Sequence, residues 1–194
     1  MKMKITHIIF FLLCCLFITS CDTADNTIEE YPDWQAKNVK FFQNLLDSID
    51  KGQKDKSWKK ILTWTKTDSG NVSSTDYIIV HKLHLGESDR CPLYSDSVKV
   101  QYLGRLLPST SYPQGAIFDQ TGTGTKLDPD TYVPAKFAVS SVVIGFSTAL
   151  QHMHKGDWWQ IYIPYNLAYG ESGTSGIPGY STLIFELRLV DFWR

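Results

Sequence analysis

The spacing of apolar residues changes at about residue 76, which divides the chain into a helical first part and a strand-rich second part. Between Asp33 and Asp50, apolar side chains recur three or four positions apart, the period of a helix with one buried face. Pro32 suits the start of this helix and Gly52 suits its end. We therefore predict one helix over residues 33–50.

From Asp76 onward the apolar period becomes two, which predicts strands that each bury one face. The strand-like runs are YIIVHKL (77–83), DSVKVQYLGRLL (96–107), WWQIYIP (158–164) and LIFELRL (183–189). Only one short helix interrupts them, because Phe146, Ala149, Leu150 and Met153 form a single apolar stripe that Gly156 would end. We predict an α+β fold, a mostly antiparallel sheet half-wrapped around one short helix and preceded by a helical N-terminal extension.

The first twenty residues have the pattern of an export signal. Lys2 and Lys4 precede the apolar run IIFFLLCCLFI (8–18), which is too short to span a bilayer as a helix. The small residues before Cys21 resemble a bacterial lipobox, in which this cysteine is lipidated; an ordinary signal peptide or a short membrane anchor would share the apolar run. We predict a lipoprotein signal peptide over 1–20, a tether and helical extension over 21–75, and a globular domain over 76–194. The protein would then be lipid-anchored to a membrane of the bacterial cell envelope.

Composition and charge narrow the function classes. The chain is 43% hydrophobic and carries a net charge of −1, so it is neither disordered nor suited to nucleic acid. After removal of the signal, Cys91 would be the one free thiol, and we expect no disulfide. The basic run KGQKDKSWKK (51–60) is interpreted as a solvated face or linker, with contact to anionic lipid headgroups as the alternative.

Several short motifs fall short of a cofactor or metal site. GTG (122–124) lacks the Lys–Ser/Thr pair of a phosphate-binding loop, and DPD (128–130) has too few ligands for a calcium loop. His152 and His154 stand two apart on a short helix, so they point to different sides. We predict no cofactor and no metal.

The second part of the chain holds a characteristic order of motifs: VKVQYLGRL, IFD (117–119), VVIGF (142–146), ALQHMHKGD and IPYNLAYGESGTSGIPGYSTLIFELRL (163–189). This order resembles that of the FKBP-type peptidyl-prolyl cis/trans isomerases. The resemblance covers residues 76–194 and implies a shallow apolar cleft that accepts a prolyl ring. It implies that the glycine-bearing loop 170–179 overhangs this cleft as a flap.

The resemblance also implies roles for individual residues. It implies catalytic roles for Tyr102, Phe118, Asp119, Phe146, Tyr169 and Phe185, and substrate-binding roles for Val142, Val143 and Ile177. The backbone N–H of Val143 and the hydroxyl of Tyr169 match the family's donors to a ligand carbonyl. Phe146 stands where the family usually has Trp, and Ala135 stands where an aromatic wall residue is often found.

Two segments beside the expected cleft, 106–116 and 120–136, are longer than in compact members of the family, and we expect them to add surface for an unfolded client chain. The partners implied are proline-containing peptides or unfolded exported proteins, together with the family's macrolide inhibitors. We predict a monomeric isomerase that assists the folding of exported proteins. A peptide-binding module or chaperone of the same fold, with little turnover, is the alternative.

Overall fold

The computed structural model describes residues 27–66 and 70–194 of the chain. The predicted signal peptide (1–20) and the predicted lipidation site Cys21 lie outside the described residues. Within them, no helix combines the length and the apolar character needed to cross a bilayer. The elements are α2 (Trp34–Asp50), β1 (Trp58–Leu62), η1 (Ser74–Asp76), β2 (Tyr77–His84), β3 (Ser97–Arg105), β4 (Ile117–Gln120), β5 (Ala135–Ala138), η2 (Val139–Ser141), α3 (Ile144–Leu150), β6 (Trp158–Ile163), η3 (Tyr165–Leu167) and β7 (Leu183–Trp193).

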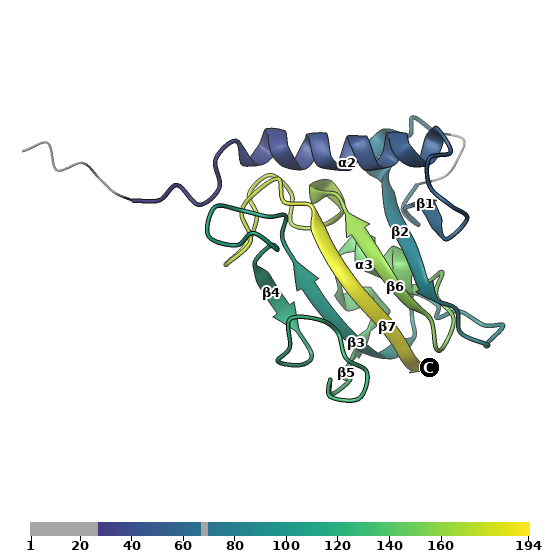
Figure 1. Cartoon of the computed structure of the whole chain (residues 1–194). Coiled ribbons are helices and arrows are strands. Elements are labelled where there is room, and N and C mark those ends of the chain that lie inside the picture. Colours follow the sequence, from purple (N-terminus) through teal and green to yellow (C-terminus); the bar gives the residue numbers. More distant parts are fainter. Residues whose placement is uncertain (1–26, 67–69) are drawn as a thin grey trace, which may run out of the picture.

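The strands form one antiparallel sheet with the order β1-β2-β6-β7-β3-β4, and β5 pairs with the first half of β3. The two long strands β3 and β7 pair from Ser97 opposite Trp193 to Arg105 opposite Ile184. They carry β4, β5 and β6 on their free edges, so they form the centre of the sheet (Figure 1).

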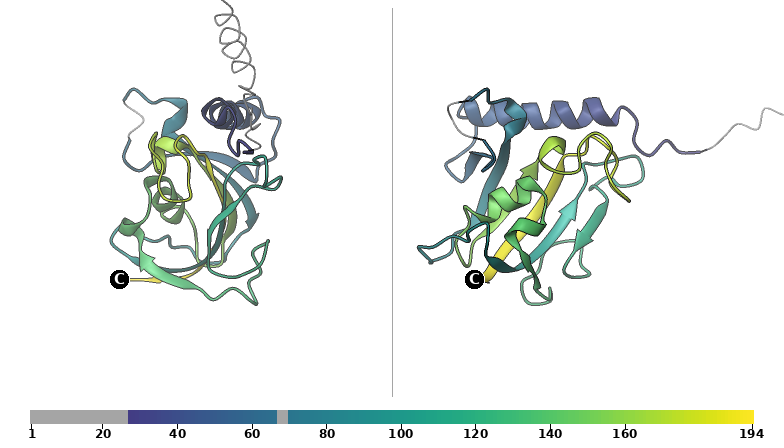
Figure 2. Two further views of the ribbon diagram at one scale, coloured as in Figure 1. Left: turned by 90° about the vertical axis from the view of Figure 1, so that its left-hand side faces the viewer. Right: turned by 180° about the vertical axis from the view of Figure 1, so that it is seen from behind.

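Helix α3 lies inside the curve of the sheet, as Figure 2 shows. Phe146, Ala149 and Leu150 of α3 pack in one core cluster with the alternate, inward-facing residues of the strands: Ile78, Val80, Val98, Val100, Trp159, Ile161, Leu187 and Leu189. The predicted α+β class with a sheet half-wrapped around one short helix is therefore confirmed. The predicted end of the helix was too late, because α3 stops at Leu150 and Gly156, at φ +96°, closes the turn that follows.

Helix α2 lies across one end of the sheet (Figure 1), and it has the predicted extent to within one residue. Its buried residues recur every fourth position: Trp34, Asn38, Phe42 and Leu46. Phe42 and Leu46 pack against Ile79 and Tyr162 on the outer face of the sheet, whereas Trp34 joins the main core. Gly52, at φ +68°, ends the helix as predicted.

The basic run 51–60 is a solvated face rather than a linker, because all five of its lysines are exposed and its last three residues form the start of strand β1. Trp58 pairs with His81 of β2, and their rings stack with centroids 4.3 Å apart. The Lys54 ammonium lies 4.5 Å from the centre of the Trp58 ring. Lysines are common on edge strands, where they discourage pairing with other chains. Because Lys59 and Lys60 interrupt the apolar pattern of β1, the sequence analysis did not predict this strand.

The two long segments beside the predicted cleft are fastened to their own domain. In the first, the Ser111 N–H donates to the Glu30 carboxylate at 3.0 Å, and the Lys37 ammonium donates to the Pro108 carbonyl at 2.5 Å. In the second, Leu127 and Tyr132 pack against Leu103 on the outer face of the sheet. Most residues of both segments nevertheless stay exposed, with Tyr112 at 51% and Val133 at 74%, so the expected surface for a client chain stays a prediction.

Candidate functional site

Five aromatic side chains from five different elements meet between the sheet and α3. They are Tyr102 of β3, Phe118 of β4, Phe137 of β5, Phe146 of α3 and Phe185 of β7. The pairing of β3 with β4, β5 and β7 brings these distant parts of the sequence together. Because side chains alternate along a strand, every second residue of β3 and β7 faces α3.

The rings pack edge to face around Phe185. Its centroid lies 5.0 Å from that of Phe146, 5.3 Å from that of Phe118 and 6.0 Å from that of Tyr102. Aromatic pairs in this arrangement each contribute about 0.5–1.5 kcal/mol beyond the burial of their surface. Gly104 makes the packing possible, because a Cβ atom there would lie 2.6 Å from the Phe185 ring and 2.7 Å from the Phe118 ring.

Beside this cluster lies a cavity of about 380 Å³, a volume within the range of small-molecule and peptide sites. Phe146 and Phe185 are only 4% and 6% exposed and form its base, while Tyr169 is 42% exposed at its rim. The residues that line it are Tyr102, Asp119, Phe137, Ser141, Val142, Val143, Phe146, Tyr169 and Phe185. The base of the site is therefore apolar and shielded from water, and its rim is polar.

The polar rim is organised by Tyr102 and Asp119. The Tyr102 hydroxyl donates a hydrogen bond to the Asp119 carboxylate at 2.7 Å. Burial of the ring, together with this bond, raises the pKa of Tyr102, so the phenol keeps its proton at neutral pH. The Tyr102 N–H in turn donates to the Thr121 hydroxyl at 3.0 Å, which fixes the strand beside the carboxylate.

The loop of residues 168–180, here called the flap loop, borders the cavity through Tyr169. Gly170, Gly173 and Gly176 have φ angles of 69°, 68° and 76°, so all three glycines adopt the left-handed region. Thr174 and Ile177 exchange two backbone hydrogen bonds of 2.9 and 3.0 Å, which close the tip of the loop. At Gly173 a Cβ would lie 2.2 Å from the Ile177 carbonyl oxygen, so glycine is required there for space as well.

The structure brings seven of the nine predicted site residues to this cavity; the other two are Phe118 and Ile177. Phe118 lies against Phe185, and Ile177 is 6% exposed and belongs to the main core.

Two further residues, Phe137 and Ser141, line the cavity and were missed by the sequence analysis. Phe137 stands two residues after Ala135 on β5, and its ring centroid lies 6.0 Å from that of Phe146. Residues two apart on a strand share a face, so Phe137 supplies the aromatic wall that Ala135 lacks.

A second cavity, of about 430 Å³, lies between the end of β2, the turn before β6 and the middle of β7 and is lined mostly by charged groups and backbone, His84, Lys155 and Arg188 among them. It lacks the aromatic walls of the first. Over residues 27–66 and 70–194, no three His, Cys, Asp or Glu side chains gather closely enough to hold a metal ion.

Comparison with known proteins connects this geometry to a family. The family model for FKBP-type peptidyl-prolyl cis-trans isomerases matches residues 89–190. A macrophage infectivity potentiator from Trypanosoma cruzi is 35% identical over 58% of this chain and 52% of its own length. The FkpA isomerase of Buchnera aphidicola is 33% identical over 80% of this chain and 56% of its own length. The chain thus spans about half the length of the curated relatives it matches.

Solved structures give the same result. A peptidyl-prolyl cis-trans isomerase from Pseudomonas syringae pv. tomato superimposes with a TM-score of 0.56 and 26% identity, over 82% of this chain and 96% of its own. FkpA from Escherichia coli superimposes with a TM-score of 0.58 and 28% identity, over 81% of this chain and 60% of its own. With the family model covering more than half of the sequence, this chain belongs to the FKBP-type peptidyl-prolyl cis-trans isomerases.

Proposed function

We propose that this chain catalyses cis/trans isomerisation of X–Pro peptide bonds in unfolded or extended polypeptides. The observation that carries the proposal is the aromatic cavity of about 380 Å³, with Phe146 and Phe185 at its base and the Tyr102–Asp119 hydrogen bond at its rim. A flat five-membered apolar ring suits such a base, and the open rim leaves room for the chain on either side of the proline.

The chemistry requires a place where a twisted amide is favoured over a planar one. Resonance holds the peptide bond planar with a barrier of about 18–20 kcal/mol, and uncatalysed X–Pro exchange takes on the order of tens to hundreds of seconds. In the twisted transition state the resonance is lost, so the carbonyl becomes less charge-separated than in the planar amide. An apolar, water-poor cavity therefore binds the transition state better than the ground state, which lowers the barrier without a covalent intermediate.

The residues around the cavity divide this task. In the proposal, Phe146 and Phe185 hold the prolyl ring, and Val142 and Phe137 support its side. The backbone N–H of Val143, the residue that precedes α3, and the Tyr169 hydroxyl are the donors assigned to the substrate's carbonyl groups. The Asp119 carboxylate, held by the Tyr102 hydroxyl, fixes the polar edge and disfavours binding of the ring in a reversed orientation.

Phe118 and Ile177 keep supporting roles in this assignment. Phe118 packs edge to face against the Phe185 ring, with centroids 5.3 Å apart, and does not itself line the cavity. Ile177 anchors the flap loop in the core, so that Tyr169 stays at the rim.

We further propose that the protein acts on exported proteins from a lipid anchor at Cys21, in the cell envelope and as a monomer. The lipobox-like sequence before Cys21 supports the anchor, and one relative, 38% identical over half of this chain, is named an outer membrane protein of Legionella longbeachae. The packing of α2 on its own domain supports the monomer, because it covers the apolar face that helix pairing would use. The family's macrolide inhibitors would compete for the same cavity.

The proposal is tested by the rate of cis-to-trans exchange in a Leu-Pro or Phe-Pro tetrapeptide, measured with the wild type, Phe185→Ala and Asp119→Ala. We expect strong acceleration by the wild type and a large loss in Phe185→Ala, because the base of the cavity is opened. If all three rates stay near the uncatalysed one while the peptide still binds, the protein is a peptide-binding module or chaperone.

A further inference from the structure

The N-terminal segment, residues 27–76, lies entirely outside the family match at 89–190, yet it is hydrogen-bonded to α3, to η3 and to the end of the flap loop. Figure 1 shows α2 running past the loops at the end of the sheet, the flap loop among them. The contacts fall into two groups, one at each end of the flap loop.

At the C-terminal end of the flap loop, α2 makes two buried hydrogen bonds. The Thr182 N–H donates to the Asn38 side-chain oxygen at 2.7 Å, and both residues are at most 2% exposed. One turn earlier on α2, the Trp34 indole N–H donates to the Ser181 hydroxyl at 2.8 Å. Asn38 is itself fixed, because its amide donates to the Trp34 carbonyl at 2.8 Å.

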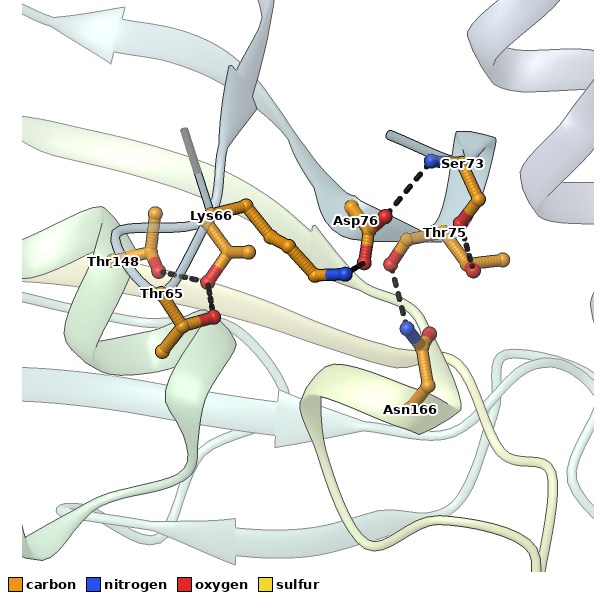
Figure 3. A network of polar contacts seen from close by, with 8 residues as sticks. Thr65, Lys66, Ser73, Thr75, Asp76, Thr148 and Asn166 are labelled. Carbon is orange, nitrogen blue, oxygen red and sulfur yellow. Dashed lines mark hydrogen bonds and ion pairs between the residues drawn. The ribbon is translucent and has the colours of Figure 1, made fainter. Parts of the chain in front are cut away.

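At the N-terminal end, residues after β1 hold η3, which leads into the flap loop (Figure 3). The Asn166 amide donates to the Thr75 carbonyl at 2.8 Å. The short helix η1, which carries Thr75, is fixed by the Asp76 carboxylate, which accepts the Ser73 N–H at 2.8 Å and lies 3.7 Å from the Lys66 ammonium.

The same N-terminal segment reaches α3 and the base of the flap loop. Thr148 of α3 lies 3.3 Å from Thr63, hydroxyl to hydroxyl. A small cavity of about 50 Å³ is bordered jointly by Asn38, Thr75, Tyr165 and Thr182, so α2, η1 and both ends of the flap loop converge there. Helix α3, η3 and the C-terminal end of the flap loop thus all contact residues that precede the family domain.

The flap loop needs such support because its neck is strained. Tyr180 has a φ of +61°, a left-handed conformation that costs a residue with a side chain about 1–2 kcal/mol. Its N–H donates to the Gly170 carbonyl at 3.0 Å, which closes the neck of the loop. Strained conformations of this kind persist where contacts of the surrounding structure hold them in place. Here those contacts come from α2, which is hydrogen-bonded to Ser181 and Thr182, the two residues after Tyr180.

We propose that the N-terminal segment is a brace that positions the flap loop over the cleft, with Asn38 as its principal positioning residue. The claim that this positioning serves catalysis rests on the proposed isomerase function. The claim that the N-terminal segment immobilises the flap loop does not depend on it. Without the Asn38 acceptor, the buried Thr182 N–H loses its hydrogen-bond partner. We expect the C-terminal end of the flap loop then to open toward water, so that Tyr169 loses its fixed place at the rim.

The test compares Asn38→Leu with Leu46→Ala in the full chain. Leucine nearly fills the volume of asparagine but cannot accept the Thr182 hydrogen bond. Leu46 lies two turns later on the same face of α2, packs in the cluster with Phe42 and Ile79, and is not among the residues around the small cavity, so its variant weakens α2 without touching the flap loop. Backbone hydrogen exchange is measured for residues 170–182 and for β2, together with peptide isomerisation.

We expect exchange in residues 170–182 to rise about tenfold in Asn38→Leu relative to β2, with kcat/KM falling by a similar factor, since one unpaired buried donor is worth about one decade. Leu46→Ala should leave the ratio of the two regions and the activity unchanged. If Asn38→Leu does not fold, Trp34→Phe with Ser181→Ala removes the neighbouring bond and should give the same pattern.

The outcomes separate the brace from the isomerase function. Unchanged exchange in residues 170–182 would overturn the brace whatever the activity, and faster exchange with full activity would overturn its positioning role. If the wild type shows no isomerase activity, the exchange ratio alone still decides whether the segment holds the loop.

Discussion

The substitution Gly104→Ala tests how tightly the base of the cavity is fitted. The added Cβ would lie 2.6 Å from the Phe185 ring and 2.7 and 2.8 Å from two atoms of the Phe118 ring. Carbon atoms pack at about 3.5–4.0 Å, so the two rings must move by about 1 Å together. Both belong to a packed cluster, and overpacking of this kind costs about 1–3 kcal/mol of the free energy of unfolding.

The larger consequence falls on the site. Phe185 lines the cavity and Phe118 does not, so the displaced Phe185 ring narrows the space for proline. A misplacement of about 1 Å can cost about a hundredfold in rate, and we expect a loss of about tenfold to hundredfold in kcat/KM. Peptide isomerisation by NMR and urea unfolding measure the two effects on the same sample.

The matched control is Gly122→Ala, where a Cβ would lie 2.3 Å from the Tyr132 ring. Tyr132 packs with Leu103 on the face of the sheet away from the cavity, so this variant should lose similar stability and keep its activity. Equal loss of activity in both variants would mean that general instability, not the shape of the cavity, governs the rate. Full activity in Gly104→Ala would refute the assignment of Phe185 to the base.

Three further predictions concern the rim and the flap loop. Tyr102→Phe removes the 2.7 Å bond to Asp119, and because this carboxylate stays solvated we expect a loss of only about 1 kcal/mol in urea unfolding. The pKa of Tyr102 is raised in the folded state, so its contribution to the free energy of unfolding is complete at neutral pH. That contribution is lost above about pH 10, where the phenol of the unfolded chain ionises. The free energy of unfolding should therefore drop more in the wild type than in Tyr102→Phe as the pH rises above this value. Gly173→Ala should lower the rate of cis/trans isomerisation of a Phe-Pro peptide far more than Gly176→Ala. A Cβ at position 173 would lie 2.2 Å from the Ile177 carbonyl oxygen, whereas a Cβ at position 176 would have no atom within 4 Å.

Much of this fold is predictable from the sequence because most elements bury one regular face. The period of two in 183–189 and the stripe of Trp34, Phe42 and Leu46 are local signals, and the structure confirms both elements. The end of α3 was harder, because Met153 stays buried in a turn after the helix stops.

The contacts that complete the site leave no such local signal. Asn38 and Thr182 are 144 positions apart, and a buried asparagine on an apolar helix face looks like an ordinary polar interruption until its partner is seen. Phe137 belongs to a strand of four residues, too short for its alternation to stand out. The resemblance to a family covered the cleft but not the N-terminal segment that holds the flap loop.

The central claim is that an apolar cavity, based on Phe146 and Phe185, lets a prolyl bond rotate. The most direct test is NMR exchange spectroscopy of a Phe-Pro peptide with substoichiometric protein, recorded together with the shifts of the protein's own amides. The account predicts cis/trans exchange well above the uncatalysed rate, with the largest shifts at Val143, Phe146, Tyr169 and Phe185. Acceleration with shifts confined to other parts of the molecule, or saturation of these residues without any acceleration, would contradict it.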